Sequence, residues 1–170
     1  MAELIGAMII NSDNGAKDLL LDNLDQAGLG VVSDIFTDIG LSQRDQELGN
    51  LNFTVRSYSL ILRILYNATY LSHQYSNEAL SILSQAVYHD GIVAGVPAGT
   101  MVAQKFGEYV AGADGQRVEP ELHNCGIVYR TGGNYLLCIM TKGQSIDQLT
   151  TVIKDISSLV YNEVSSNNQK

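Results

Sequence analysis

Two short polar segments carry the residue types with the most chemistry in this sequence. Ser12-Asp13-Asn14 offers a hydroxyl, a carboxylate and an amide in a row, and Lys105-Phe106-Gly107 places an ammonium close to a residue without a side chain. Such groups can bind a ligand or move a proton. Neither segment is specific when taken singly, because Ser-Asp-Asn is a good helix cap and a lone lysine in a strand usually points to solvent.

Together, the two segments resemble the second and third signature motifs of the beta-lactamase and penicillin-binding-protein superfamily, Ser-Asp-Asn and Lys-Thr-Gly. They occur in the family's order and on the kinds of element that the family uses. The flanking sequence is also similar to class A members, and the resemblance runs from about residue 3 to 164. The similar stretches are residues 3–10, 95–100, 125–129 and 137–141.

The resemblance implies acyl transfer, in which a serine attacks a strained lactam or a peptide carbonyl. It gives Ser12 the role of relaying a proton to the leaving nitrogen, and Asn14 that of hydrogen-bonding the acyl side-chain amide of the substrate. Lys105 would supply positive charge for the substrate carboxylate and favour proton transfer through Ser12. Gly107 would let the backbone approach the ligand, and the N–H of Glu108 would be one oxyanion donor.

Departures from the family pattern limit what this chain can do alone. The first motif, Ser-x-x-Lys, does not occur, because no lysine has a serine three residues before it. The nucleophile, its lysine partner and the second oxyanion donor go with it. Phe106 stands where the family has a hydroxyl that binds the substrate carboxylate, which argues against a penicillin-like ligand. Glu47 lacks the spacing of the family's Glu-x-x-Leu-Asn loop, so we interpret it as a solvated loop residue; Asp13 is interpreted as structural.

Three hypotheses remain open at this point. The chain is a portion of a class A-related serine hydrolase, inactive alone, whose complete form acts on a beta-lactam or a peptidoglycan-like amide. Alternatively, it is a non-catalytic binding or assembly module derived from the same fold, or an unrelated domain with chance motifs. The distance between the Ser12 and Lys105 side chains discriminates, because a hydrogen bond between them would define a groove of the family's type.

The charge and composition argue against several other functions. A net charge of -8 and a pI near 4.6 disfavour nucleic acid or an anionic membrane as partner, since either needs clustered Lys and Arg. No run approaches the roughly 18 apolar residues of a membrane span. The amino terminus lacks the basic stretch of a secretory signal, so the compartment stays open, although the resemblance suggests an extracytoplasmic bacterial protein.

The histidines and cysteines give no sign of a metal or another cofactor. His73, His89 and His123 occur singly, and we interpret each as a surface or locally bonded histidine. Cys125 and Cys138 lack the Cys-x-x-Cys spacing of a zinc or redox site.

The elements that must hold these residues predict an α+β fold of the beta-lactamase/transpeptidase type, in an incomplete version. We expect one domain over residues 1–164, helical up to residue 99, with a disordered tail over 165–170. Helical periodicity is clearest over residues 4–10, over 54–71 and from Ser76 onward. An antiparallel meander over 101–109, 125–129 and 135–141 precedes a last helix that begins at the capping box of residues 145–148.

Two further expectations follow from this arrangement. If a hairpin pairs Arg130 with Tyr135, Cys138 is diagonal to Cys125 at roughly 7–8 Å, too far for a disulfide, so we expect free thiols. Residues 135–141 should be an edge strand, and the apolar face around Tyr58, Leu62 and Leu65 should lack its usual cover. Both features favour association, either as a homo-oligomer or with a complementing amino-terminal segment.

Overall fold

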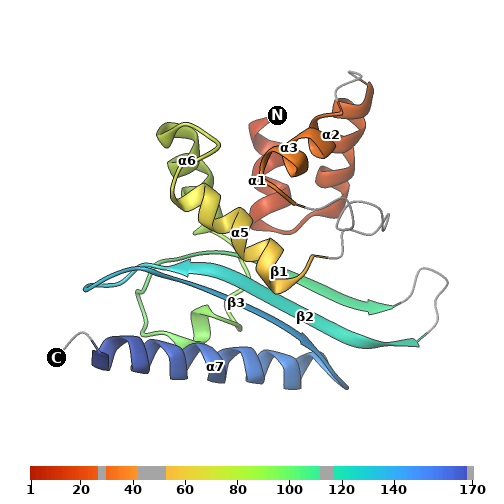
Figure 1. Cartoon of the computed structure of the whole chain (residues 1–170). Coiled ribbons are helices and arrows are strands. Elements are labelled where there is room, and N and C mark those ends of the chain that lie inside the picture. The colour runs from red at the N-terminus through yellow and green to blue at the C-terminus, as the bar shows by residue number, and fades with distance from the viewer. Residues whose placement is uncertain (27–29, 42–52, 112–116, 168–170) are drawn as a thin grey trace.

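The computed structural model describes residues 1–26, 30–41, 53–111 and 117–167 of this 170-residue chain. Over these residues the chain folds into a helical part, followed by an antiparallel sheet with one long helix behind it (Figure 1). This is the α+β arrangement that the sequence predicts. Glu47 lies outside the described residues, so its interpretation stays a prediction.

Helices make up the first part of the described chain, and hydroxyl side chains begin two of them. Thr54 Oγ1 accepts a hydrogen bond from the N–H of Ser57 at 3.1 Å, and Ser72 Oγ accepts one from the N–H of Tyr75 at 3.3 Å. Each bond satisfies a backbone donor that the helix itself leaves free. The helices are α1 (Ala2–Ile10), α2 (Asn14–Gln26), α3 (Val31–Asp38), α5 (Val55–Tyr66) and α6 (His73–Leu83).

Two helix boundaries differ from the prediction. Ser72 rather than Ser76 caps α6, and Ser76 lies one turn inside the helix with 1% of its surface exposed. α5 ends at Tyr66 instead of residue 71. Ala68 takes a left-handed backbone conformation, with φ of 50°, through which a right-handed helix cannot continue.

The sheet contains three antiparallel strands in the order β1 (Val102–Ala111), β2 (Arg117–Val128) and β3 (Tyr135–Lys142). A short 3-10 turn, η1 (Val93–Gly95), precedes β1. The sheet is the predicted meander, although β2 begins at Arg117 rather than at residue 125. Within the described part of the chain β3 pairs with β2 alone, so it is an edge strand, as expected.

Different helices cover the two faces of the sheet (Figure 1). The last helix, α7 (Ile146–Asn167), packs on one face together with η1, and α5 and α6 pack on the other. Successive strand residues alternate between the faces. Leu122 and Val128 therefore pack with Ile153 of α7, whereas Ile127 packs with Leu62 of α5.

The last helix begins as predicted and ends later than predicted. Ser145 Oγ accepts the N–H of Gln148 at 3.3 Å, which confirms the amino-terminal cap. The helix continues to Asn167, so residues 165–167 are helical and the expected tail is wrong for them. Ser165 Oγ donates to the Tyr161 carbonyl at 2.7 Å, one turn back, which uses the serine inside the helix.

A disulfide joins Cys125 and Cys138, so the prediction of free thiols is wrong. The two residues are direct partners across β2 and β3 rather than diagonal neighbours. A register error of two residues in the predicted hairpin accounts for the difference.

The hairpin between β2 and β3 has a longer loop than the sequence suggested. Tyr135 pairs with Val128, not with Arg130. The side chain of Asn134 takes the place of a strand partner, because its Oδ1 accepts the Arg130 N–H at 3.2 Å. Gly133 has φ of 128°, a conformation that residues with a side chain rarely adopt, and it turns the chain inside this loop.

The apolar face of α5 is better covered than expected. Leu62 retains 4% of its exposure and packs with Ala103 and Cys125 of the sheet, so the expected gap is wrong at this position. Tyr58 and Leu65 also pack against this cluster. The sheet itself supplies the cover, because the odd-numbered residues Ala103, Cys125 and Ile127 of β1 and β2 face α5 and α6.

Candidate active site

Ser12 lies in the loop between α1 and α2 and has an unusual backbone. Its φ is 56°, a left-handed conformation that costs most residues about 1–2 kcal/mol. The neighbouring Asp13 holds the loop, because its Oδ1 accepts the Ala16 N–H at 3.0 Å and its own N–H donates to the Ala7 carbonyl at 3.2 Å. Asp13 therefore caps α2, in agreement with its predicted structural role.

Lys105 reaches Ser12 from the middle of β1. Its Nζ donates to Ser12 Oγ at 2.5 Å and to the Phe106 carbonyl at 3.3 Å. Partial burial of the ammonium lowers the pKa of Lys105 below its usual value. The structure thus places the two motif side chains in direct hydrogen-bond contact, as the groove hypothesis requires.

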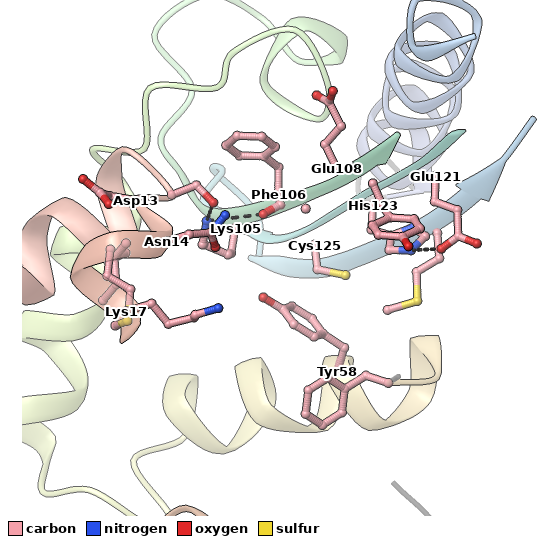
Figure 2. A pocket seen from close by; sticks show the side chains of 17 residues that line it. Asp13, Asn14, Lys17, Tyr58, Lys105, Phe106, Glu108, Glu121, His123 and Cys125 are labelled. Atoms are coloured by element: carbon pink, nitrogen blue, oxygen red, sulfur yellow. Dashed lines mark hydrogen bonds and ion pairs between the residues drawn. The ribbon is translucent and has the colours of Figure 1, made fainter. Parts of the chain in front are cut away.

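These side chains lie at the wall of a cavity of about 940 Å³ between the helical part and the sheet (Figure 2). Every predicted site residue lines it: Ser12, Asn14, Lys105, Phe106, Gly107 and Glu108. A cavity of this size can hold a drug-sized molecule. The further lining residues are Met8, Ile9, Asp13, Lys17, Phe53, Tyr58, Tyr109, Glu121, His123, Cys125 and Met140.

The backbone of β1 is accessible from the cavity beside Gly107. A Cβ placed on Gly107 would meet no other atom within 4 Å, so the absence of a side chain leaves open space there. Glu108 follows with an exposed side chain. This geometry is compatible with close approach of a ligand, and the oxyanion role of the Glu108 N–H stays a prediction.

Phe106 is held by an aromatic neighbour. Its ring stacks on Tyr88 with a centroid separation of 4.5 Å and an interplanar angle of 22°. Lys105 Nζ lies over the same ring, 5.0 Å from its centroid. The position therefore offers an aromatic surface where the family pattern has a hydroxyl.

Tyr58 lines the cavity, although the sequence pattern predicts only that it belongs to the apolar face of its helix. Its ring packs against Phe53 at a centroid distance of 6.0 Å, and its hydroxyl points into the cavity (Figure 2). Burial raises the pKa of Tyr58 to about 12, so the hydroxyl stays protonated near neutral pH. It lies on the apolar stripe of a helix, and no local signal separates a tyrosine of that kind from a core residue.

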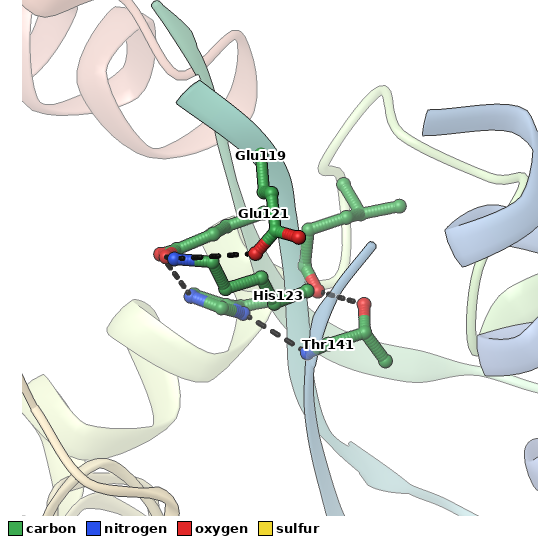
Figure 3. Close-up of polar contacts among 6 residues, drawn as sticks. Glu119, Glu121, His123 and Thr141 are labelled. Atoms are coloured by element: carbon green, nitrogen blue, oxygen red, sulfur yellow. Dashed lines mark hydrogen bonds and ion pairs between the residues drawn. The ribbon is translucent and has the colours of Figure 1, made fainter. Parts of the chain in front are cut away.

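His123 also lines the cavity and is bonded locally, as its interpretation requires (Figure 3). Its Nδ1 accepts the Thr141 N–H at 3.3 Å, and its Nε2 lies 3.6 Å from Glu121 Oε2. Glu121 in turn pairs with Lys142 at 3.1 Å. Because Nδ1 accepts a backbone hydrogen bond, the proton of the neutral ring lies on Nε2.

Within the described residues, no three His, Cys, Asp or Glu side chains come together as metal ligands. None of the helices in the described ranges has the length and apolar character needed to cross a membrane.

A family model described as "Beta-lactamase enzyme family" matches residues 1–164 of this chain. This match rejects the hypothesis of an unrelated domain with chance motifs. Comparison with curated proteins gives no significant match.

Solved structures with the same fold include beta-lactamases and a protein named PBP-A. A beta-lactamase from Sphaerobacter thermophilus has a TM-score of 0.79 at 20% identity, with 96% of this chain and 63% of that chain covered. PBP-A has a TM-score of 0.76 at 21% identity, with 96% and 61% covered. A class A beta-lactamase from Bacteroides cellulosilyticus has a TM-score of 0.73 at 20% identity, with 96% and 63% covered. The chain therefore spans about three fifths of the length of these structures.

Proposed function

Because this chain belongs to the beta-lactamase enzyme family, we propose that it is a portion of a class A-related serine hydrolase and supplies the proton-relay half of its acyl-transfer site. The observation that carries the proposal is the hydrogen bond from Lys105 Nζ to Ser12 Oγ, at 2.5 Å, on the wall of a ligand-sized cavity. The substrate class is a beta-lactam or a peptidoglycan-like amide. A variant of the similar protein PBP-A was solved as an acyl-enzyme complex with penicillin G.

The proposed chemistry is proton transfer to the leaving nitrogen. When a nucleophile attacks the amide carbonyl, the C–N bond breaks and its nitrogen needs a proton. Ser12 donates its hydroxyl proton to that nitrogen and recovers one from the Lys105 ammonium. Burial lowers the pKa of Lys105, and this favours release of its proton. Asn14 binds the acyl side-chain amide, and the backbone beside Gly107 receives the carbonyl oxygen.

The nucleophile itself is absent from this sequence, since no Ser-x-x-Lys occurs in it. We therefore propose that the chain is inactive alone and that an amino-terminal segment with that motif completes the site. The coverage of about three fifths of the solved relatives supports this view. Incubation of the chain with a chromogenic cephalosporin should give no colour and no change of intact mass. Saturable turnover, or an adduct on Ser12, would overturn the proposal.

A non-catalytic binding or assembly module is the second candidate, and Phe106 is the observation that favours it. An aromatic ring at this position cannot make the hydrogen bond that a hydroxyl makes to a substrate carboxylate. A module of this kind would bind a ligand in the cavity without needing Ser12. The two candidates differ in one readout, because only the hydrolase loses its activity when Ser12 is replaced in the completed protein.

We also propose that the chain associates, either with a second copy or with the amino-terminal segment. The edge of β3 is the supporting feature, because an edge strand presents unpaired N–H and C=O groups. Leu159 and Ile156 on the outer side of α7 add exposed apolar surface. Light scattering over a range of concentrations should show species larger than a monomer. A cooperatively melting monomer at every concentration would contradict association.

A further inference from the structure

The ammonium of Lys105 already contacts three groups of the protein. A lysine ammonium carries three N–H groups and no acceptor. Ser12 Oγ and the Phe106 carbonyl accept from it at 2.5 Å and 3.3 Å. The Phe106 ring also contacts the ammonium, with the centroid 5.0 Å from Nζ, which is within the range of a cation–π interaction. A substrate carboxylate at this ammonium would compete with these partners.

The Phe106 ring is fixed in this position by the residues behind it. Tyr88 stacks on it at 4.5 Å between centroids. Tyr88 is itself fixed, because Gln104 Nε2 donates to its carbonyl and its hydroxyl lies 3.5 Å from Thr150 Oγ1. The space is tight as well, since a Cβ on Gly91 would collide with the Tyr88 ring.

The buried side chain of Gln104 connects this aromatic stack to the centre of the sheet. Asn124 Nδ2 donates to Gln104 Oε1 at 2.9 Å, and Asn124 Oδ1 accepts the Ile92 N–H at 2.8 Å. Both amide side chains are almost fully buried, with 1% and 0% of their surfaces exposed. A satisfied buried network of this kind holds its members in one arrangement. The segment that carries Tyr88 is therefore tied to β1 and β2.

We propose that Phe106 is a positioning and specificity-determining residue, which keeps Lys105 on Ser12 and makes the groove select amide substrates with no carboxylate beside Lys105. This inference rests on the proposed function of the groove. It assigns Lys105 to the proton relay and not to anchoring an anionic substrate.

The charges along the cavity agree with a neutral substrate at this end. Glu108 places an exposed carboxylate two residues after Phe106, and it would repel a substrate carboxylate. Lys17 is the cation on the opposite wall, but its Nζ lies 3.2 Å from Asp18 Oδ1. Farther along, His123 faces Glu121 at 3.6 Å. Both lysines that line the cavity thus have a protein partner already.

The positioning part of the proposal can be tested without a ligand. A methylene group close to an aromatic face resonates upfield, so the ε-protons of Lys105 should lie upfield of those of the exposed Lys154 in a proton NMR spectrum. Phe106→Tyr should retain this shift, and Phe106→Leu should remove it while the dispersion of the other signals shows that the chain stays folded. Equal shifts for Lys105 and Lys154 in the unmodified chain would overturn the positioning role.

The specificity part is tested with a matched pair of probes, N-acetyl-D-alanyl-D-alanine and its carboxamide, titrated while the Gly107 amide signal is followed. The unmodified chain should bind the carboxamide at least as tightly as the carboxylate. Phe106→Thr adds a hydroxyl and removes the ring, so it should prefer the carboxylate about tenfold or more, the worth of one charge-assisted hydrogen bond. Phe106→Leu, which adds no hydroxyl, is the control and should gain no such preference.

The outcomes separate this inference from the proposed function. An equal preference for the carboxylate in the unmodified chain and in Phe106→Thr would overturn the specificity role. Failure of both probes to shift Gly107 in either protein would contradict the proposed function of the groove and the substrate selection with it. The ε-proton shifts of Lys105 would still decide the positioning role in that case.

Discussion

The hydrogen bond between Ser12 and Lys105 should make a measurable contribution to the free energy of unfolding. The effect of replacing Ser12 by glycine should therefore depend on whether Lys105 is present. Ser12→Ala removes the acceptor of a 2.5 Å bond from a half-buried ammonium. A hydrogen bond to a charged group contributes about 1.5–3 kcal/mol to the free energy of unfolding. Ser12→Ala should therefore destabilise the chain by about that amount.

Ser12→Gly removes the same bond but also relieves the backbone, because Ser12 has φ of 56°. Glycine avoids a left-handed penalty of about 1–2 kcal/mol, and its greater freedom in the unfolded chain offsets about 0.4–1 kcal/mol of that gain. The net effect of Ser12→Gly should therefore lie between no change and a loss of about 3 kcal/mol. In a Lys105→Met background there is no bond to lose, so the same change should stabilise the chain by up to about 1.6 kcal/mol.

Urea unfolding of the single and double variants measures these values as a double-mutant cycle. The coupling between Ser12 and Lys105 should be about 1.5–3 kcal/mol. A coupling near zero, or a Ser12→Gly change that destabilises both backgrounds equally, would refute the reasoning about this contact.

Three further changes probe other parts of the fold. The pKa of Tyr58, raised to about 12, contributes stability that is present below pH 10 and is lost as the pH rises from 10 towards 12. Relative to Tyr58→Phe, the free energy of unfolding of the unmodified chain should fall by up to roughly 2.7 kcal/mol in that window. Unfolding at several pH values measures this loss. Replacing both Cys125 and Cys138 by alanine should lower the free energy of unfolding by about 3 kcal/mol for a bridge of sequence separation 13, and thiol titration of the unreduced, denatured chain should count no free thiol. Asp13→Ala should cost about 1 kcal/mol because α2 loses its cap, and a change below a few tenths in a urea titration would contradict that role.

Features set by local chemistry were predicted well from the sequence. The loop that carries Ser12, the cap at Ser145 and the meander all depend on residues close together in the chain. The contact between Ser12 and Lys105 spans 93 residues and was reached only through the family resemblance, because periodicity cannot pair two distant motifs.

The errors came from side chains that replace backbone partners. The side chain of Asn134 accepts the Arg130 N–H, and the hairpin loop is longer than predicted. The strand register therefore differs by two residues from the predicted one, which places Cys125 directly opposite Cys138, where they form a disulfide. A loop of Gly and Asn residues is compatible with several lengths, so the sequence alone could not choose among them.

Tertiary packing decided the remaining differences. Tyr58 belongs to the apolar stripe of α5 by sequence, yet its hydroxyl faces the cavity, which forms only when α5 packs over the sheet. Leu62, on the same stripe, is covered by Ala103 and Cys125. Periodicity marks a buried face, but it does not say where that face meets a cavity.

The intact mass of a completed protein is the most direct test of Ser12 as the proton relay. An amino-terminal segment with Ser-x-x-Lys, taken from the part of the Sphaerobacter thermophilus beta-lactamase outside the match, would be fused ahead of this chain and treated with a beta-lactam that lacks a free carboxylate. Cooperative melting of the fusion and of its Ser12→Ala variant would establish that both are folded. An acyl adduct should form on the segment's serine, and it should form about 10²-fold or more slowly in the Ser12→Ala variant. Equal rates of adduct formation in the two folded proteins would contradict the role of Ser12 as the proton relay.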